Sequence, residues 1–268
     1  MLAGSAKPAL WRQRKASIAL SRRAVVGIWR QPQVWIPSIL FPLFFAALNT
    51  AALSRATNIP GFPAADSFLD FIFPATIVQG VLFGSLGGAS ELAQDIETGF
   101  FDRLTATPVA RTSILVGRLA GSAVLGACQA LVFMAAFTAF GADVKAGPAG
   151  VVVLPLVAML LALGVGGLAS AMALRTGSVE AVQGAFPLIF ITIFASSAFF
   201  PRELMKGWFQ DVATYNPISW MVEGMRHLVL FGFDWGEAAT ALGVPLVLSV
   251  TATALCLRGL KRRLAADS

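Results

Sequence analysis

Residues 91–118 read ELAQDIETGFFDRLTATPVARTSILVGR and form the only long charged, patterned segment between two strongly apolar runs. We call it the elbow segment. Leu92, Ile96, Phe100 and Leu104 recur at steps of four residues, with charged residues beside and opposite them. Apolar residues at this spacing line one face of a helix, so the pattern predicts an amphipathic helix of about three turns. This helix either continues the preceding apolar run or lies along the membrane surface.

Two further features shape the elbow segment. Gly99 interrupts the helical pattern and permits either a bend or the close approach of another backbone. Thr107 and Pro108 predict the start of the next helix, a cap followed by proline in the first turn. Arg111 and Arg118 flank that start at the level of the lipid headgroups. We interpret the segment as a surface that receives force from another protein; the alternative is an ordinary solvated hairpin.

The composition indicates an integral membrane protein. Of the 268 residues, 57% are hydrophobic and 13% are charged, and the mean hydropathy is +0.75. A soluble domain carries about 25% charged residues, so this chain has too little polar surface to cover a water-facing globule. The formal net charge of +6 lies in short loops and termini, where it orients helices and does not indicate a nucleic-acid partner.

The apolar runs predict an all-α polytopic membrane protein with six transmembrane helices. A bilayer core of about 30 Å requires about 20 apolar residues in helical form. Six runs meet this length, and together they form a single transmembrane domain over residues 34–258. The predicted spans are residues 34–54, 68–90, 112–140, 150–174, 178–200 and 238–258.

The positive charges orient these spans. With the N-terminus in the cytoplasm, fifteen Lys and Arg lie in inside segments and five in outside segments. This asymmetry predicts that both termini are cytoplasmic, including a basic tail over residues 259–268. Residues 1–33 are also basic, with Trp11, Ile18 and Trp29 on one face, which predicts an interfacial amphipathic helix. The stretch is far too long for the basic region of a signal peptide.

The long connection before the sixth span predicts two short amphipathic helices in the outer leaflet. Leu204, Trp208 and Val212 are spaced to share one helical face over residues 201–214. Asn216 and Pro217 then predict a second helix start. Neither helix is long or apolar enough to span. Treating the second as a span would place the basic C-terminus outside.

The sequence lacks the motifs of catalytic and metal sites. It contains no G-x-x-x-x-G-K-[ST], no G-x-S-x-G, no H-E-x-x-H and no Cys/His cluster, so we expect no catalytic, cofactor or metal site. His227 is the only histidine, and we interpret it as an interfacial polar residue. Cys128 and Cys256 lie far apart in apolar runs and are expected to be buried thiols.

Small and polar residues inside the spans have two readings each. Gly80, Gly84 and Gly88 form a row along the second span that suits either packing within the chain or a seam between subunits, and Gly117 and Gly121 repeat the motif. Amides and a phenylalanine stripe in the spans either pack or line a substrate path. These candidate path residues are Asn49, Gln79, Gln129, Gln183, Phe186, Phe190 and Phe194.

The pattern DIETGFFDRLTATPVAR of residues 95–111 resembles the cytoplasmic loop of type-2 ATP-binding-cassette exporter permeases. The drug-resistance permeases of the daunorubicin and doxorubicin kind are the most similar in length and layout. The likeness extends to Phe200 and Pro201, to Trp208, and to the Asn-Pro-Ile run that begins at Asn216. It covers nearly the whole chain, and the motifs occur in order and at the expected spacing.

The resemblance implies one half of a membrane dimer, expected to be a homodimer, with a separate ATPase chain that holds ATP and Mg. The elbow segment then contains a cytoplasmic coupling helix, which docks with the N-terminal helix in a cleft of the ATPase. The implied coupling residues are Glu91, Asp95, Glu97, Gly99, Phe100, Arg103 and Pro108. The implied outer-gate residues are Pro201, Trp208, Asn216, Pro217, Glu223 and Arg226.

These expectations predict the permease subunit of an ATP-driven exporter in a bacterial cytoplasmic membrane. Neutral, Phe-rich spans favour an amphipathic drug-like or lipid-like cargo, moved by alternating access. One alternative is a permease for lipid-linked glycans or polysaccharides, which the single tyrosine of the chain disfavours. Another is a membrane interaction subunit that transports nothing. A membrane-embedded enzyme is the weakest hypothesis, because no nucleophile–base pair or metal constellation is visible.

Overall fold

The computed structural model describes residues 32–105 and 111–266. Almost all of the predicted N-terminal helix, and the helix start predicted at Thr107 and Pro108, lie outside the described residues. The described part of the chain is helical and contains no strand. The all-α class is therefore confirmed, and the domain boundaries stay a prediction.

Five helices are long and apolar enough to cross a membrane, judged by length and composition. They correspond to the first, second, third, fourth and sixth predicted spans. Their bounds are α2 Pro32–Ala52, α3 Phe68–Glu97, α5 Arg111–Ala139, α6 Gly147–Thr176 and α11 Trp235–Ala266. The chain is thus a multi-pass membrane protein.

The fifth predicted span is divided into two short helices, α7 Val179–Gln183 and α8 Phe186–Phe194. Pro187 lies in the first turn of α8, where its missing N–H costs nothing. In an uninterrupted helix, its ring would meet the carbonyl four residues earlier, which is that of Gln183. The helix ends there, and Gly184 caps it. Neither piece reaches the length of a span, so the count of six stays a prediction.

The connection before α11 is also more broken than the spacing predicted. Arg202–Leu204 is a short 3-10 helix, η2, and α9 begins only at Trp208 and ends at Tyr215. Met205 ends η2 in an extended conformation, and Gly207, with φ +64, directly precedes the first residue of α9. The spacing predicted that Leu204 and Trp208 share a helix. In the structure they do not.

The second predicted helix of this connection is present as α10, Pro217–Leu230, and it starts where expected. The side chain of Asn216 accepts a hydrogen bond from the amide of Ile218, 2.9 Å away. The remaining short elements are η1 Ala56–Asn58 in the first connection and α4 Phe100–Thr105 after α3.

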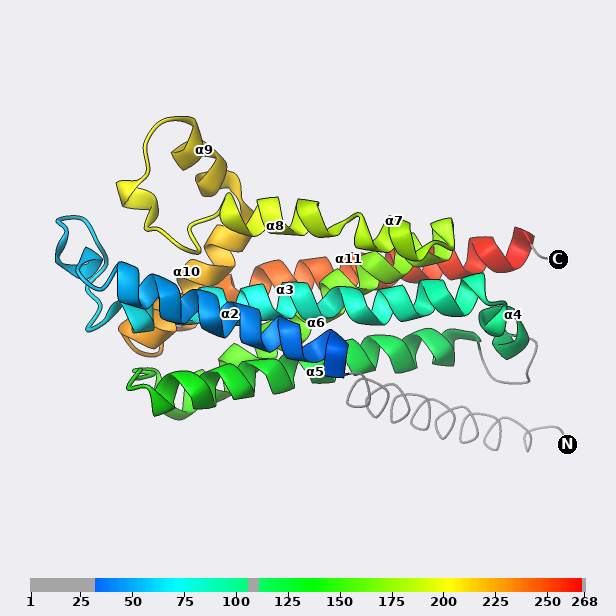
Figure 1. The fold of residues 1–268 in the computed structure, drawn as a ribbon, viewed down its shortest axis with the longest axis horizontal. Helices are drawn as coiled ribbons and strands as arrows, with labels where there is room; N and C mark the ends of the chain where they lie inside the picture. Colours follow the sequence, from blue (N-terminus) through cyan, green and yellow to red (C-terminus); the bar gives the residue numbers. More distant parts are fainter. Residues whose placement is uncertain (1–31, 106–110, 267–268) are drawn as a thin grey trace, which may run out of the picture.

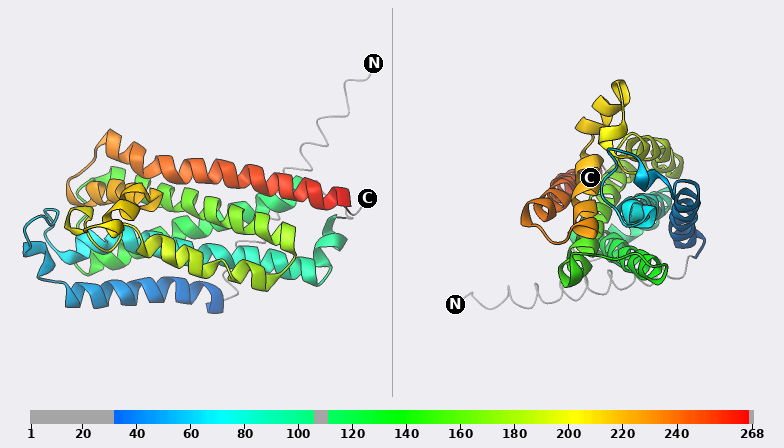
Figure 2. Two further views of the ribbon diagram at one scale, coloured as in Figure 1. Left: turned by 90° about the horizontal axis from the view of Figure 1, so that it is seen from above. Right: turned by 90° about the vertical axis from the view of Figure 1, so that its left-hand side faces the viewer.

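The helices form an elongated bundle around α3 (Figures 1 and 2). Viewed along the bundle, α3 lies near the centre, with α2 and α11 on opposite sides (Figure 2). Within its apolar window, 89% of α3 is buried, against 17% for α2. Helix α3 is apolar on all sides and rich in small residues, so neighbours can cover every face of it.

The two ends of the bundle differ. Helix α4 and the C-terminal end of α11 lie at one end, which we call the elbow end (Figure 1). Helices η1, α9 and α10 lie at the other, which we call the far end (Figure 1). At the far end α3 starts with a capping box, in which the side chain of Ser67 accepts from the amide of Asp70 and the carboxylate of Asp70 accepts from the amide of Ser67.

Candidate functional site

The elbow segment extends α3 beyond the predicted membrane span. The helix continues to Glu97, turns at Thr98 and Gly99, and resumes as α4. Gly99 has φ +68, and no described atom lies within 4 Å of where its Cβ would be. Gly99 therefore allows the chain to bend, and it does not make room for another backbone.

The apolar stripe of the elbow segment is largely used inside the chain. Leu92 is 0% exposed and Ile96 is 7% exposed, and both belong to a core cluster with Leu115 of α5 and Leu260 of α11. On α4, Phe101 is buried in the same cluster, whereas Phe100 is half-buried. The stripe that could have entered a groove of another protein thus packs within its own bundle up to Ile96.

Two acidic residues of the elbow segment bind other helices. Asp95 forms an ion pair with Arg118 of α5. The Oε1 atom of Glu97 accepts a hydrogen bond of 2.9 Å from the backbone amide of Val179, the first residue of α7. The end of α3 is therefore attached both to the third predicted span and to the start of the fifth.

Helices α6 and α11 complete this arrangement. A Cβ on Gly177, the left-handed cap of α6, would lie 3.2 Å from a methyl carbon of Ile96. The guanidinium of Arg263 in α11 lies 6.0 Å from the ring centre of Phe101. None of these contacts was predicted. The glycine after Arg175 and Thr176 is a recognisable helix stop, but its neighbour across the bundle is not readable from sequence.

The other predicted coupling residues remain at the surface of the elbow end. Glu91 is half-buried, and Arg103 is exposed with its guanidinium 5.9 Å from the ring centre of Phe100. Pro108 lies outside the described residues. Among the described residues from Glu91 to Leu104, the exposed ones are Gln94, Glu97, Thr98, Asp102 and Arg103.

The glycine row of α3 receives side chains of α5, so the prediction of packing within the chain is confirmed. A Cβ on Gly80 would lie 2.3 Å from the ring of Phe133, and one on Gly84 would lie 2.8 Å from Nε2 of Gln129. A Cβ on Gly88 would lie 3.5 Å from the hydroxyl of Ser122. Gly117 and Gly121 are buried on α5.

Two of the predicted path amides are satisfied within the protein. The Nδ2 atom of Asn49 donates to the carbonyl of Phe45 one turn earlier, at 2.7 Å. The Nε2 atom of Gln129 donates to the hydroxyl of Ser38 at 2.7 Å, which ties α5 to α2. These two amides therefore join helices or complete a helix turn.

The other two path amides differ. Gln183 is exposed on α7. Gln79 is 0% exposed, and neither Oε1 nor Nε2 has a hydrogen-bond partner within the described ranges 32–105 and 111–266. An unpaired buried amide is costly, so Gln79 is the amide of this set with capacity for a further ligand.

The predicted phenylalanine stripe is part of an aromatic cluster between α2, α3 and α8. The ring of Phe83 on α3 lies 5.1 Å from that of Phe186 and 5.7 Å from that of Phe41 on α2. Phe190 stacks on Phe194 with 4.3 Å between ring centres. Phe186 and Phe190 stay 40% and 37% exposed, so the cluster presents an aromatic face at the side of the bundle.

At the far end, Arg226 joins three segments. It is 5% exposed, and its Nε donates to the carbonyl of Phe71 at 3.1 Å. Its Nη2 atom donates to the carbonyls of Ser197 and Ala198 at 3.0 and 2.8 Å. The guanidinium also lies 3.8 Å from the ring centre of Phe71. Arg226 thus fixes the chain after α8 to α3 and α10.

Other predicted gate residues surround this position. Glu223 pairs with Arg202 at 2.5 Å. The side-chain amide of Asn216 donates to the carbonyls of Thr192 and Ala195 at 2.7 and 3.0 Å, which closes the end of α8. Pro201 is buried, and Trp208 is 75% exposed.

Two basic side chains of the far end complete the picture. Lys145 forms an ion pair of 2.8 Å with Asp66, and this hydrogen bond raises the pKa of Lys145 above its usual value. His227 is half-buried against the ring of Phe231, 5.1 Å between ring centres. No cluster of three or more His, Cys, Asp or Glu side chains suited to a metal ion occurs in the described part of the chain.

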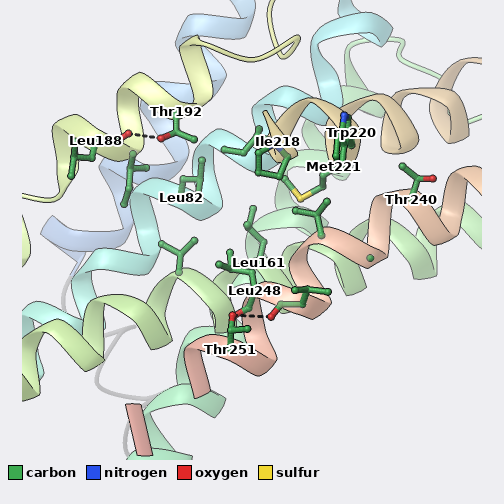
Figure 3. A pocket seen from close by; sticks show the side chains of 16 residues that line it. Leu82, Leu161, Leu188, Thr192, Ile218, Trp220, Met221, Thr240, Leu248 and Thr251 are labelled. Carbon is green, nitrogen blue, oxygen red and sulfur yellow. Dashed lines mark hydrogen bonds between the residues drawn. The ribbon is translucent and has the colours of Figure 1, made fainter. Parts of the chain in front are cut away.

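A cavity of about 760 Å³ opens between α8 and α11 (Figure 3). Leu82 of α3, Leu161 of α6 and Met221 of α10 lie at its back. Pro217 is the one predicted gate residue that contributes to its lining. No sequence pattern indicated this cavity, because its lining comes from five helices.

Comparison with known proteins extends over most of the chain. The family described as ABC-2 type transporter matches residues 16–230. A transport permease named ycf38 from Porphyra purpurea is 26% identical over 229 residues, covering 84% of this chain and 77% of its own. The daunorubicin resistance ABC transporter permease protein DrrB1 of Streptomyces coeruleorubidus is 27% identical over 232 residues, covering 85% and 80%. A doxorubicin resistance permease, DrrC of Mycobacterium tuberculosis, is 25% identical over 197 residues, covering 74% and 70%.

Proposed function

This chain belongs to the ABC-2 type transporter family, and on that premise we propose that it exports amphipathic drug-like or lipid-like molecules by ATP-driven alternating access. The family makes it a transmembrane permease subunit of an ABC exporter and not the ATPase. A separate ATPase chain supplies the energy and holds ATP and Mg. A second permease subunit, in the simplest case another copy, completes the transporter.

The proposed topology has six spans in a bacterial cytoplasmic membrane, with both termini and the elbow end in the cytoplasm. Helices α7 and α8 together serve as the fifth span. Support comes from the apolar character of residues 179–194 and from the excess of Lys and Arg at the N-terminus, the elbow segment and the C-terminus.

The observation that carries the coupling proposal is the attachment of Glu97 to Val179 at the elbow end. The ATPase docks on the exposed part of the elbow segment after Ile96, together with the N-terminal helix. Helix α3 is buried along most of its length and transmits a tilt as a unit. Because of this hydrogen bond, α7 moves when α3 tilts. The break at Gly184 allows α8 to rotate relative to α7.

The proposed path lies along the aromatic face of α2, α3 and α8. Stacking on Phe83, Phe186 and Phe190 favours a cargo with flat apolar rings, since such contacts contribute about 0.5–1.5 kcal/mol each beyond their area. Gln79 offers an unpaired amide at the buried side of α3. The printed names of two relatives, which concern daunorubicin and doxorubicin resistance, agree with such a cargo.

The proposal is tested in proteoliposomes that contain the permease and its ATPase. The double variant Glu97→Ala with Gly99→Pro is expected to insert normally, to lose ATPase co-purification and to lose ATP-dependent daunorubicin uptake. Unchanged ATPase binding and uptake in that variant would refute the coupling role of the elbow segment.

The same system separates the competing functions. Cysteines placed at Phe190 and Phe194 are expected to react with water-soluble reagents in one nucleotide state and not in another. Absence of labelling in every nucleotide state favours a membrane subunit that transports nothing. Labelling that is protected by a lipid-linked glycan and not by daunorubicin favours the glycan exporter instead.

A further inference from the structure

The cavity between α8 and α11 lies behind the aromatic face and not on it. Leu188 and Thr192 line the cavity, one helical turn apart on α8. Phe186 and Phe190 are offset from them by two residues, which corresponds to about 200° around a helix. The two sets therefore occupy opposite faces of α8, so the cavity is separate from the proposed cargo path.

The lining offers an occupant nothing but apolar contact. Its hydroxyl and indole donors are already bonded to backbone carbonyls of the protein, two of them along the dashed lines of Figure 3. These donors and acceptors are Thr192 to Leu188, Thr251 to Val247, Thr240 to Gly236 and Trp220 to Thr214, at 2.7 to 3.0 Å. A ligand whose acceptors need hydrogen bonds would lose those it makes with water and find no free donor among these side chains.

The cavity opens to the exposed apolar surface of the bundle. Leu188 at one edge is 67% exposed and Val247 at the other is 65% exposed. Val250, on the next turn of α11 and outside the cavity lining, is 62% exposed. Since α11 is one of the five apolar helices of a multi-pass membrane protein, molecules of the bilayer have direct access through this opening.

The position of the cavity along the bundle matches one leaflet. Its α11 lining extends from Thr240 to Thr251, a rise of about 16 Å, or about half of the hydrocarbon core. Trp220 lies at its far-end side, and Trp235, which begins α11, is 80% exposed. Exposed tryptophans near one end of a membrane bundle are typical of the boundary between headgroups and hydrocarbon.

From these observations we infer that the cavity holds an acyl chain of a membrane phospholipid, with the headgroup at the level of Trp220. A volume of about 760 Å³ falls within the range of ligand sites, about 300–1,000 Å³. The acyl chain fills the space between α8 and α11 and contacts α8 on the face opposite Phe190. The inference does not depend on the ATPase, the elbow segment or the cargo.

The test uses the full-length permease, purified in mild detergent and examined by native mass spectrometry for retained phospholipid. Gly243→Phe is designed to fill the cavity, because Gly243 lines it and no described atom lies within 4 Å of where its Cβ would be. Val250→Phe is the matched control, since it adds an aromatic ring to the same helix outside the cavity. Leu188→Phe fills the cavity from the opposite side.

Wild type and Val250→Phe are expected to retain a phospholipid, and Gly243→Phe to retain at least about tenfold less. Losing the burial of about two methylenes already corresponds to that factor. Equal retention in all three chains would overturn the inference. Loss of dimers in Gly243→Phe would also overturn it, because a second copy would then be the occupant. Displacement of the retained molecule by daunorubicin would overturn it as well, because the cavity would then be a cargo site.

A second measurement decides the matter if the filled variants misfold. Trp220 is kept as the sole tryptophan, and the chain is placed in phosphatidylglycerol vesicles whose acyl chains carry bromine. Quenching of Trp220 is expected to survive dilution into vesicles of unlabelled lipid for longer than quenching of a sole tryptophan at Trp235. Equal loss at the two positions contradicts a bound acyl chain.

Discussion

The carboxylate of Glu97, the last residue of α3, accepts a hydrogen bond of 2.9 Å from the backbone amide of Val179, the first residue of α7. The two residues are 82 positions apart in the chain. This contact joins the helix that carries the elbow segment to the helix pair that carries the aromatic face. It gives the proposed coupling a defined physical step, and it predicts how single substitutions will act.

Removing the carboxylate should weaken coupling without removing the ATPase. Glu97→Ala is expected to lower ATP-dependent transport about two- to tenfold, since an exposed hydrogen bond contributes about 0.5–1.5 kcal/mol. ATPase co-purification should stay unchanged, because the exposed residues Thr98, Asp102 and Arg103 of the docking surface are kept. Transport assays in proteoliposomes check this, with Glu203→Ala as an exposed control at the far end. Equal transport by both variants would show that the contact carries no force.

Any substitution of Gly99 should disturb the bend between α3 and α4. Gly99→Ala forces a left-handed backbone on a residue with a Cβ, at a cost of about 1–2 kcal/mol. We expect α4 to be displaced and the fraction of co-purified ATPase to fall. The control is Gly243→Ala, a helical position where alanine is favourable by up to about 1 kcal/mol. If both alanine variants bind the ATPase equally, the bend at Gly99 is not needed for docking.

The approach of α3 to α5 predicts a compensating pair. Gly80→Ala places a methyl group in the ring of Phe133 and should lower the melting temperature, with an overpacking cost of about 1–3 kcal/mol. In a background of Phe133→Ala, the same change should cost less, because the ring is gone and the carbonyl of Ser38, at 3.1 Å, is the tight contact that remains. Gly88→Ala, which meets only an ordinary contact with Ser122, is the matched control. Additive effects in the double variant would contradict the packing.

Gln79 should show opposite effects on stability and transport. Gln79→Leu removes an unpaired buried amide and is expected to raise the melting temperature, with a gain of about 1–3 kcal/mol. If the amide also binds cargo, the apparent affinity for daunorubicin falls in the same variant. Gln129→Leu, which loses its hydrogen bond to Ser38, should instead be destabilising. A loss of stability in Gln79→Leu would indicate that the amide is already satisfied.

Arg226 should stabilise the packing of the far end. Arg226→Ala leaves the buried carbonyls of Phe71, Ser197 and Ala198 without their donor, each worth about 1–3 kcal/mol. We expect a lower melting temperature and faster proteolysis after α8. Lys206→Ala, at an exposed position nearby, controls for the loss of charge alone. Similar protease resistance in the two variants would argue against this role.

The site predictions from sequence were of two kinds. Those that depend on neighbours along the chain could be made from the sequence: the helix start at Asn216, a bend as one of two alternatives for Gly99, and the phenylalanine stripe of α8. Those that depend on a neighbour elsewhere in the bundle could not. An unpaired Gln79 and a hydrogen-bonded Gln129 look the same in sequence, because only the facing helix distinguishes them.

The elbow segment shows the same limit. Its stripe at four-residue steps predicts a helix with one apolar face, but it does not say which protein covers that face. In the structure, Leu92 and Ile96 are covered by α5, α6 and α11 of the same chain. Of this stripe, Phe100 and Leu104 are the described residues that stay half-buried and are available to a partner.

The sequence by itself determined that this is a helical membrane protein with the motifs of ABC-2 type permeases, and where its long helices lie. The length of apolar runs, the charge asymmetry and the local helix signals are properties of neighbouring residues. They can therefore be recognised in the sequence alone. The tertiary structure decided the attachment of Glu97 to Val179, the burial of Arg226 and the cavity behind α8. Each of these depends on which faces of distant helices meet, and that is set by the packing of the whole bundle.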